Sequence, residues 1–252
     1  MPLDDKQTIS TPLFGILGSL GFSHYSNYHH FNTNTLFWSL TRLYSYYYRV
    51  ITVLPLPREQ RPFLESDIEG FIIRMRIVLN DIGYIIWQLV PPNQRYLKGP
   101  KGKTHPKNRE MSIHTIAAFF QSEQSELEFD SAFKANLEWI NRLRDQRDNV
   151  VHYKAKALVI ETTPVSFSLV NAAYTEAYED TPDGGKRLIT TPVYDFVNDQ
   201  ILSLHKFMHT DLASAFKEYI DRSNLKYQEV GSNPRMGCLG IELFKQVNGI
   251  HD

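Results

Sequence analysis

The sequence predicts a mainly α protein, an up-and-down helical bundle with a small β-hairpin insertion before the last long helix. Three observations support this fold class. Apolar residues recur at helical spacing through several long segments, most clearly from Ile68 to Leu89. Prolines follow two of these segments, where a helix must stop. After about residue 155 the apolar pattern changes to the alternation that is typical of strands.

The first elements are an arm and a helix. Residues 1–34 are expected to be irregular, because glycines interrupt any long element there. A first helix should begin near Asn34, a favourable N-cap, and end before Pro55. Its apolar stripe consists of Leu36, Leu40, Leu43, Tyr47, Val50 and Leu54.

The second helix has the clearest pattern in the chain. Ser66 followed by Glu69 predicts a capping box at its start, and Pro91 predicts its end. The stripe between them consists of Ile68, Ile72, Met75, Leu79, Ile82, Ile86 and Leu89. A basic loop is expected over residues 93–110, and a short helix from Ser112 to Gln121.

A fourth helix is predicted from Asp130 or Ser131 to the polar cluster that ends at His152. Two strands should follow, over residues 158–161 and 165–169, with a possible third strand over residues 187–190. Thr191 as N-cap and Pro192 at the first helical position predict the start of the last long helix. The tail from residue 223 carries no firm pattern.

These elements predict one domain over residues 1–252. It comprises the arm (1–34), the bundle (35–221) with an insertion at about 155–190, and a tail (222–252). A formal net charge of −1 excludes a whole-chain basic field for nucleic acid, so any such contact needs a local patch.

Composition also bounds the compartment and the cofactors. Cys238 is the single cysteine, which excludes an intrachain disulfide and a cysteine metal cluster and favours a reducing compartment. The N-terminus is acidic where a signal peptide is basic, and charges interrupt the most apolar stretch, 68–90. A cytoplasmic protein without a membrane partner, metal or cofactor is therefore expected.

The segment from Arg147 to His152 is the best candidate for chemistry. Arg147 projects roughly 20° from Ile140, so a cation lies in the core-facing stripe of the fourth helix. Asp148 and His152 are four residues apart and can form a hydrogen bond on one face. Arg147 and His152 lie roughly 140° apart on a regular helix. They are expected to converge only if the helix loosens near Asn149, or if two subunits share a groove.

This segment, Arg147-Asp148-Asn149-Val150-Val151-His152, resembles the arginine, polar residue, spacer, histidine motif of the HEPN superfamily. The preceding helix, 139–145, and the helical bundle are also similar to that superfamily. The resemblance covers roughly residues 35–221.

The resemblance implies a metal-independent endoribonuclease or an RNA-binding protein, of a toxin or defence system. It implies a homodimer with paired motifs, and a cognate antitoxin or other protein partner. His152 would act as general base or acid on the RNA 2′-hydroxyl, and Arg147 would stabilise charge on the phosphate. Asp148 or Asn149 would orient these groups. The candidate RNA-binding residues are Arg144, Lys101, Lys103, Lys107 and Arg109.

Structural interpretations of the same residues remain open. Arginines near a helix C-terminus interact favourably with its carbonyls and dipole, and the neighbouring aspartates can pair with them. The basic loop can follow a phosphate backbone or can be simply solvated. The alternative function is a non-catalytic helical interaction or dimerisation module.

Two further groups have an ordinary and a functional interpretation. Arg74 and Arg76 are either solvated or paired between helices, or they lie beside the Arg147 cluster as phosphate contacts. His205 and His209 have the four-residue spacing of two zinc ligands, but no third ligand is evident. They are interpreted as ordinary histidines at the edge of an apolar stripe.

Overall fold

The computed structural model describes residues 13, 16–17, 27–89, 97–98, 104–105, 112–121, 128–152, 154–170 and 178–222. For residues 27–34, 97–98, 104–105 and 121 it describes the backbone alone.

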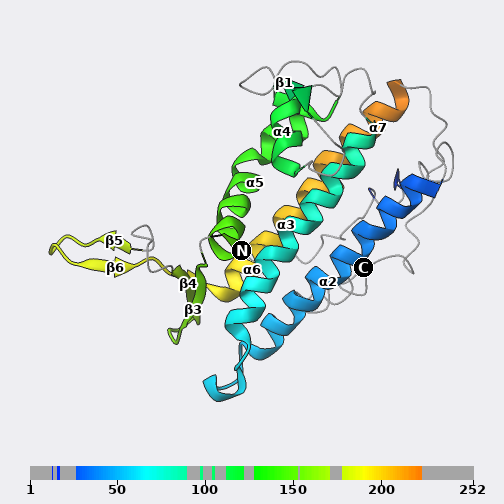
Figure 1. Cartoon of the computed structure of the whole chain (residues 1–252). Helices are drawn as coiled ribbons and strands as arrows, with labels where there is room; N and C mark the ends of the chain where they lie inside the picture. The colour runs from blue at the N-terminus through cyan, green and yellow to red at the C-terminus, as the bar shows by residue number, and fades with distance from the viewer. Residues whose placement is uncertain are drawn as a thin grey trace.

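Long helices dominate the described chain. They are α2 (Asn27–Val53), α3 (Leu64–Leu89), α5 (Asp130–Val151), α6 (Val193–Lys206) and α7 (Ala213–Arg222), with the short α4 (Ile113–Gln121) and the 3₁₀ turn η1 (Arg58–Gln60). A π-helical segment, η4 (Phe207–Leu212), joins α6 to α7 without a break. α2, α3, α5 and the continuous α6–η4–α7 segment lie side by side, and each of these four runs in the opposite direction to the one before it (Figure 1). The predicted mainly α, up-and-down arrangement is confirmed.

The described strands form small antiparallel pairs near the ends of the bundle. They are β1 (Leu97–Lys98), β2 (Thr104–His105), β3 (Lys156–Ile160), β4 (Ser166–Val170), β5 (Tyr178–Asp180), β6 (Lys186–Leu188) and β7 (Thr191–Pro192). β3, β4 and β7 make a three-stranded sheet, in which Leu158 is opposite Ser168. The predicted hairpin after α5 is therefore confirmed.

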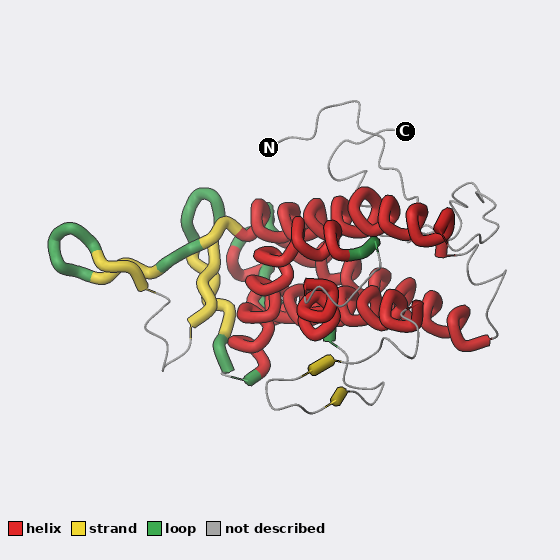
Figure 2. Tube along the Cα trace, turned by 90° about the horizontal axis from the view of Figure 1, so that it is seen from above, coloured by secondary structure: helices red, strands yellow, loops and turns green. Residues whose placement is uncertain are grey.

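A second hairpin, β5–β6, projects away from the helices (Figures 1 and 2). Its turn contains Gly184 at φ +80°, in the left-handed region that glycine adopts without strain. Glu179 and Arg187 form a cross-strand ion pair on it. The sequence predicted one strand over residues 187–190. In the structure β6 contains the first two of these residues, residues 189 and 190 belong to no strand, and β7 was not predicted.

The N-terminal region contributes more to the bundle than an irregular arm would. α2 begins at Asn27 rather than near Asn34, since no glycine or proline lies between these positions to stop it. Leu13, Ile16 and Leu17 are buried in the same hydrophobic core as the long helices. The segment before residue 35 is therefore partly helical and partly buried.

The predicted capping box at Ser66 is wrong. α3 begins at Leu64, and the N–H of Asp67 already donates to the carbonyl of Phe63 at 2.8 Å. Glu69 instead accepts the N–H of Ala157 at 3.0 Å, while Glu65 accepts that of Val159 at 3.1 Å. These carboxylates satisfy the exposed edge of β3, a tertiary role that outweighs the local cap.

The predicted cap of the last helix is also wrong. Thr191 pairs with Phe167 in the β4–β7 ladder, and the helix begins two residues later, at Val193. The N–H of Val193 donates to the carbonyl of Val165 at 2.9 Å, so the sheet takes part in starting the helix. By contrast, Ser112 caps α4 as a local signal predicts, because its Oγ accepts the N–H of Thr115 at 3.2 Å.

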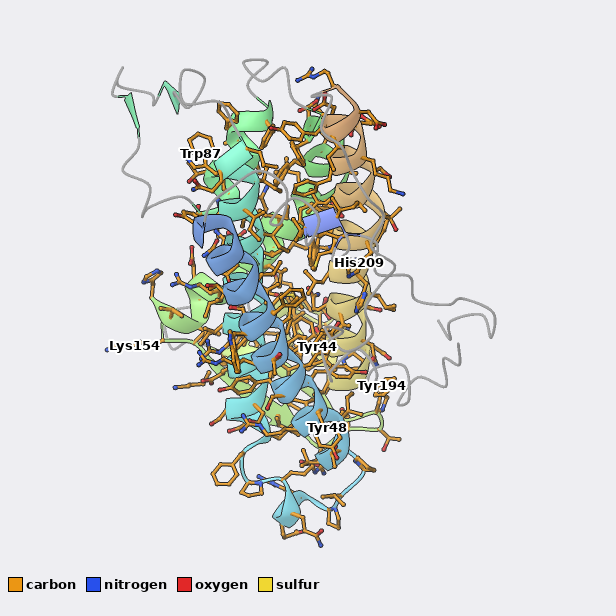
Figure 3. All side chains as sticks on the ribbon, turned by 90° about the vertical axis from the view of Figure 1, so that its right-hand side faces the viewer. Tyr44, Tyr48, Trp87, Lys154, Tyr194 and His209 are labelled. Carbon is orange, nitrogen blue, oxygen red and sulfur yellow. The ribbon has the colours of Figure 1, made fainter. Side chains whose placement is uncertain are left out.

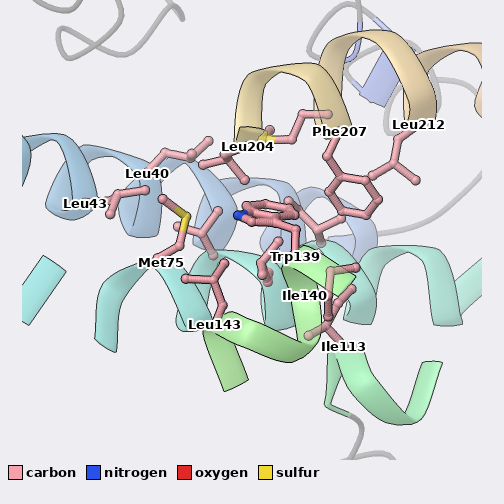
Figure 4. Packing of buried hydrophobic residues seen from close by; sticks show 14 of the residues in the cluster. Leu40, Leu43, Met75, Ile113, Trp139, Ile140, Leu143, Leu204, Phe207 and Leu212 are labelled. Atoms are coloured by element: carbon pink, nitrogen blue, oxygen red, sulfur yellow. The ribbon is translucent and has the colours of Figure 1, made fainter. Parts of the chain in front are cut away.

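The core is continuous along the bundle and rich in aromatic side chains. Figure 4 shows one part of it, where Trp139 and Phe207 pack among aliphatic side chains. Phe133 of α5 is fully buried and stacks on Phe120 of α4, with ring centroids 5.2 Å apart. Phe207 of η4 meets the edge of Phe133 at 5.8 Å. This cluster holds α5 between α4 and the last helical segment.

Gly83 permits the close approach of α3 to α4. A Cβ at this position would lie 2.8 Å from Cδ1 of Ile116 and 3.3 Å from Cα of Ile113. Gly83→Val is therefore expected to lower the free energy of unfolding by about 1–3 kcal/mol, because α4 must move. Urea denaturation followed by circular dichroism measures this change. Ala118→Val, on the exposed face of α4, is the control and should change stability by no more than about 0.5 kcal/mol.

A buried polar contact joins α2 to α6 across the core. Figure 3 labels Tyr44 of α2 and His209, which lies one turn beyond this contact. The hydroxyl of Tyr44 lies 2.5 Å from Nε2 of His205. The ring centroids of His205 and His209 are 5.3 Å apart. Burial lowers the pKa of His205 to about 4, and burial together with His205 lowers the pKa of His209. The interpretation of this pair as ordinary structural histidines agrees with their position in the core.

Acidification is expected to destabilise the bundle through these histidines. At pH values between the ordinary pKa of 6.5 and the folded pKa of about 4, His205 is protonated in the unfolded chain but stays neutral in the folded protein. Stability should fall as pH drops from 7 toward 4, by on the order of 3 kcal/mol from His205 alone. Denaturation midpoints at pH 7 and pH 4.5 measure the slope. A His205→Phe variant that keeps the full slope would contradict this assignment.

None of the described helices is long and apolar enough to cross a membrane.

Candidate functional site

The candidate site lies where α5 ends beside the β3–β4 hairpin. Leu143, one turn before Arg147, is buried, whereas 32 % of the Arg147 side chain is exposed. Arg147 therefore continues the core-facing stripe, as predicted, but its guanidinium reaches the open end of the bundle. The charged end of Arg147 therefore stays in contact with solvent although its Cα lies on the core-facing stripe.

Arg147 and His152 meet within one chain. Nη1 of Arg147 lies 2.8 Å from Nε2 of His152. The predicted loosening near Asn149 is not needed, because α5 stays regular to Val151 and His152 caps it with its N–H on the Asp148 carbonyl at 2.8 Å. The long arginine side chain spans the angular gap. Since the guanidinium can only donate, Nε2 accepts, and a neutral ring carries its proton on Nδ1.

Asp148 is held by Arg147 rather than by His152. Its Oδ1 accepts from Nη1 of Arg147 at 2.9 Å, while Nε2 of His152 is 3.9 Å away. The predicted Asp148–His152 hydrogen bond is therefore wrong, because the guanidinium stands between the two. Asn149 contributes its main-chain carbonyl, which accepts the N–H of Ala155 at 2.9 Å and turns the chain toward β3.

Arg144 forms a second arginine–histidine contact one turn earlier. Its Nη1 lies 3.0 Å from Nε2 of His114 on α4, and its Nη2 donates to Asp145 at 2.8 Å. Nδ1 of His114 lies 3.1 Å from Oδ1 of Asn141. Burial and the charge of Arg144 both lower the pKa of His114. His114 is thus a neutral brace that fixes the direction of Arg144.

Arg76 of α3 is the third arginine of the cluster and the most buried, with 7 % of its surface exposed. Burial is the main reason that its pKa falls to about 10, while Asp148 opposes the shift and Arg147 and Arg144 add to it. It remains charged at neutral pH. These interactions agree with the predicted position of Arg76 near the Arg147 cluster, and its role as a phosphate contact stays a prediction. Arg74 is not among the charges that act on Arg76.

The cluster presents more positive than negative charge. Three guanidiniums face two carboxylates, and the ring nitrogens of His114 and His152 that face the arginines accept rather than donate. Such a surface suits an anion with several acceptor oxygens, and a phosphodiester fits this description. Among the residues with described side chains, no group of three potential metal ligands gathers here or elsewhere.

The remaining predicted RNA contacts were placed in the basic loop. Lys101, Lys103, Lys107 and Arg109 lie outside the described residues. Sequence reasoning did not single out His114, because a lone histidine on a short helix carries no spacing signal. Only its place after the Ser112 cap, facing the arginine-rich end of α5, could have suggested it.

A pocket of about 470 Å³ lies on another side of α5, against α6. Its lining includes Arg142, Gln146, Asp195 and Asp199, and none of the cluster residues. The arginine cluster is thus a surface site rather than part of this pocket.

Comparison of the chain with protein-family models, with curated proteins and with solved structures gave no match. The HEPN resemblance therefore depends on the motif residues and on the helical bundle around them.

Proposed function

We propose that the protein is a HEPN-like, metal-independent endoribonuclease of a toxin or defence system. The observation that supports this most is the 2.8 Å contact between Nη1 of Arg147 and Nε2 of His152 at the solvent-facing end of α5. A general base and a phosphate-binding cation lie together on one chain. The His152 side chain is 59 % exposed to solvent, so an RNA chain can reach it.

The chemistry requires a neutral base next to a fixed cation. His152 takes the proton of an RNA 2′-hydroxyl, and the 2′-oxygen attacks the adjacent phosphorus. The bond from phosphorus to the 5′-oxygen breaks, and that oxygen receives a proton from solvent or from a second histidine. Arg147 stabilises the charge that develops on the non-bridging oxygens. The products are a 2′,3′-cyclic phosphate and a 5′-hydroxyl.

Arg147 also links substrate binding to the base. In the absence of RNA its Nη1 occupies the lone pair of Nε2 that must receive the proton. A phosphate competes for the guanidinium, and its arrival frees this lone pair. A second copy of the chain would bring a second arginine–histidine pair to the same groove, as the HEPN resemblance implies.

The direct test is incubation of the full chain with mixed single-stranded RNA in excess EDTA. Cleavage that leaves 2′,3′-cyclic ends supports the proposal, and an RNA with one 2′-deoxy sugar should resist at that linkage alone. Intact RNA over a range of salt concentrations, with a protein shown to be folded, would overturn it. Light scattering reports whether the active form is a dimer.

Exposed aromatic side chains favour the alternative function, a helical interaction module. Trp38 on α2 is 68 % exposed and Phe63, before α3, is 71 % exposed. Large apolar side chains in such positions are enriched at protein interfaces. If the protein does not cleave RNA, Trp38→Ala and Phe63→Ala should disrupt any self-association that light scattering detects.

A further inference from the structure

Arg76 is a buried cation without a hydrogen-bonded counter-ion in the described part of the chain. Its Nη1 is inaccessible to solvent and no described residue accepts a hydrogen bond from it. Burying an unpaired charge is costly, so proteins retain one where another requirement maintains it.

The neighbouring carboxylates are already engaged. Asp145 accepts from Arg144 at 2.8 Å, and Asp148 accepts from Arg147 at 2.9 Å. Asp148 attracts Arg76, but Arg144 and Arg147 repel it. The described cluster therefore lacks one negative charge.

The side chains of Arg144 and Arg147 are also fixed in orientation by their neighbours. His114 and Asp145 fix Arg144 from two sides, and His152 and Asp148 both take Nη1 of Arg147. Nε and Nη2 of Arg147 have no acceptor among the described residues. Arg144 is therefore arranged before any ligand arrives, and Asp148 still holds Arg147 once its contact with His152 breaks, which reduces the entropy lost on binding.

We propose that Arg76, Arg144 and Arg147 together form a phosphate-binding site that holds the backbone of an RNA chain beside His152. The missing negative charge is supplied by the bound phosphate group. That the phosphate belongs to RNA rests on the proposed function, whereas the site itself rests on the arginine cluster. Arg76 acts as a positioning residue that supplies charge from beneath the other two.

The first experiment measures thermal unfolding of the full chain with inorganic phosphate and with chloride at equal ionic strength. Phosphate should raise the Tm of the wild type by several degrees more than chloride. Arg76→Met should raise the Tm in chloride by roughly 2–6 °C, because it removes a buried unpaired charge while Asp148 keeps Arg147. The same variant should lose most of the phosphate effect.

Arg74→Met is the matched control, since it removes the same group from the same helix and should leave the phosphate effect intact. If Arg76→Met does not fold, Arg144→Gln replaces it and should also reduce the phosphate effect, because 34 % of that side chain is exposed. A wild type that phosphate stabilises no more than chloride does would overturn the proposal.

A second experiment identifies the source of the phosphate. Binding of a labelled single-stranded RNA is measured by fluorescence anisotropy in a His152→Ala background, against a mononucleotide. Arg76→Met should weaken RNA binding about tenfold and lower the salt slope by about 1. If the mononucleotide bound as tightly as the RNA, or if Arg76→Met left the RNA affinity unchanged, the assignment of the phosphate to RNA would be overturned.

The two proposals fail separately. Phosphate and RNA binding that depend on Arg76, without cleavage, would remove the ribonuclease and leave the binding site. Cleavage that depends on His152 but not on Arg76 would remove this inference alone.

Discussion

His152→Ala is expected to lower the rate of RNA cleavage by roughly 10²–10⁴-fold, the usual contribution of a positioned general base. His152 lies at the C-cap of α5 with 59 % of its side chain exposed, so its removal leaves no cavity. Folding should therefore be unchanged, and the loss should appear in the cleavage rate alone. Single-turnover cleavage of a defined RNA in EDTA measures the effect.

Arg147 provides the companion to this experiment. Arg147→Lys keeps the charge but loses the planar donor pair, so the rate should fall less than in Arg147→Ala. Arg142→Ala is the matched control, because this arginine comes from the same helix, has a side chain 67 % exposed and lines the pocket against α6 instead. Equal cleavage rates in the wild type and His152→Ala would contradict the ribonuclease proposal, and the interaction module would then be the better proposal.

Phe133→Ala is expected to have the largest effect on stability. The ring is fully buried, stacks on Phe120 and meets Phe207 at its edge. Truncation should lower the free energy of unfolding by about 3–5 kcal/mol and the Tm by roughly 6–20 °C. Equilibrium unfolding in guanidinium, followed by tryptophan fluorescence, measures it.

The control is Phe63→Ala, which removes the same ring from a position that is 71 % exposed and should change stability by about 0.5 kcal/mol or less. Phe133 lies about 28 Å along α5 from His152. Below its unfolding temperature, Phe133→Ala should therefore retain the cleavage activity of the wild type. A stability change as small as that of the control would mean that the aromatic cluster does not hold α5.

The helices were predictable because their signal is repeated along the chain. The apolar stripes of α3 and α5 predicted their span to within a few residues, and Pro91 predicted the end of α3. The predicted capping box of α3 was wrong, because Glu69 instead satisfies the N–H of Ala157, which is 88 residues away. A cap depends on one or two side chains, and a distant acceptor or donor can redirect them.

The site was predictable in part. Arg147 was located by its inward position, and its contact with His152 by their shared motif. The spacing wrongly predicted that Arg147 and His152 would need a loosened helix or a second subunit to meet. A helical projection compares Cα directions and ignores the length of the arginine side chain. His114 and Asn141 remained unrecognised, since neither has a spacing that distinguishes it from ordinary polar residues.

The sequence by itself determined the helical class, the hairpin after α5 and the cation on an apolar stripe, because each of these is a local pattern set by backbone periodicity. Only the tertiary structure decided which charges meet. It brings Arg76 of α3 beside Arg144 and Arg147 of α5 and leaves it without a hydrogen-bonded carboxylate among the described residues. Packing of separate helices sets such distances, and Coulomb energies depend on distance and burial rather than on order along the chain.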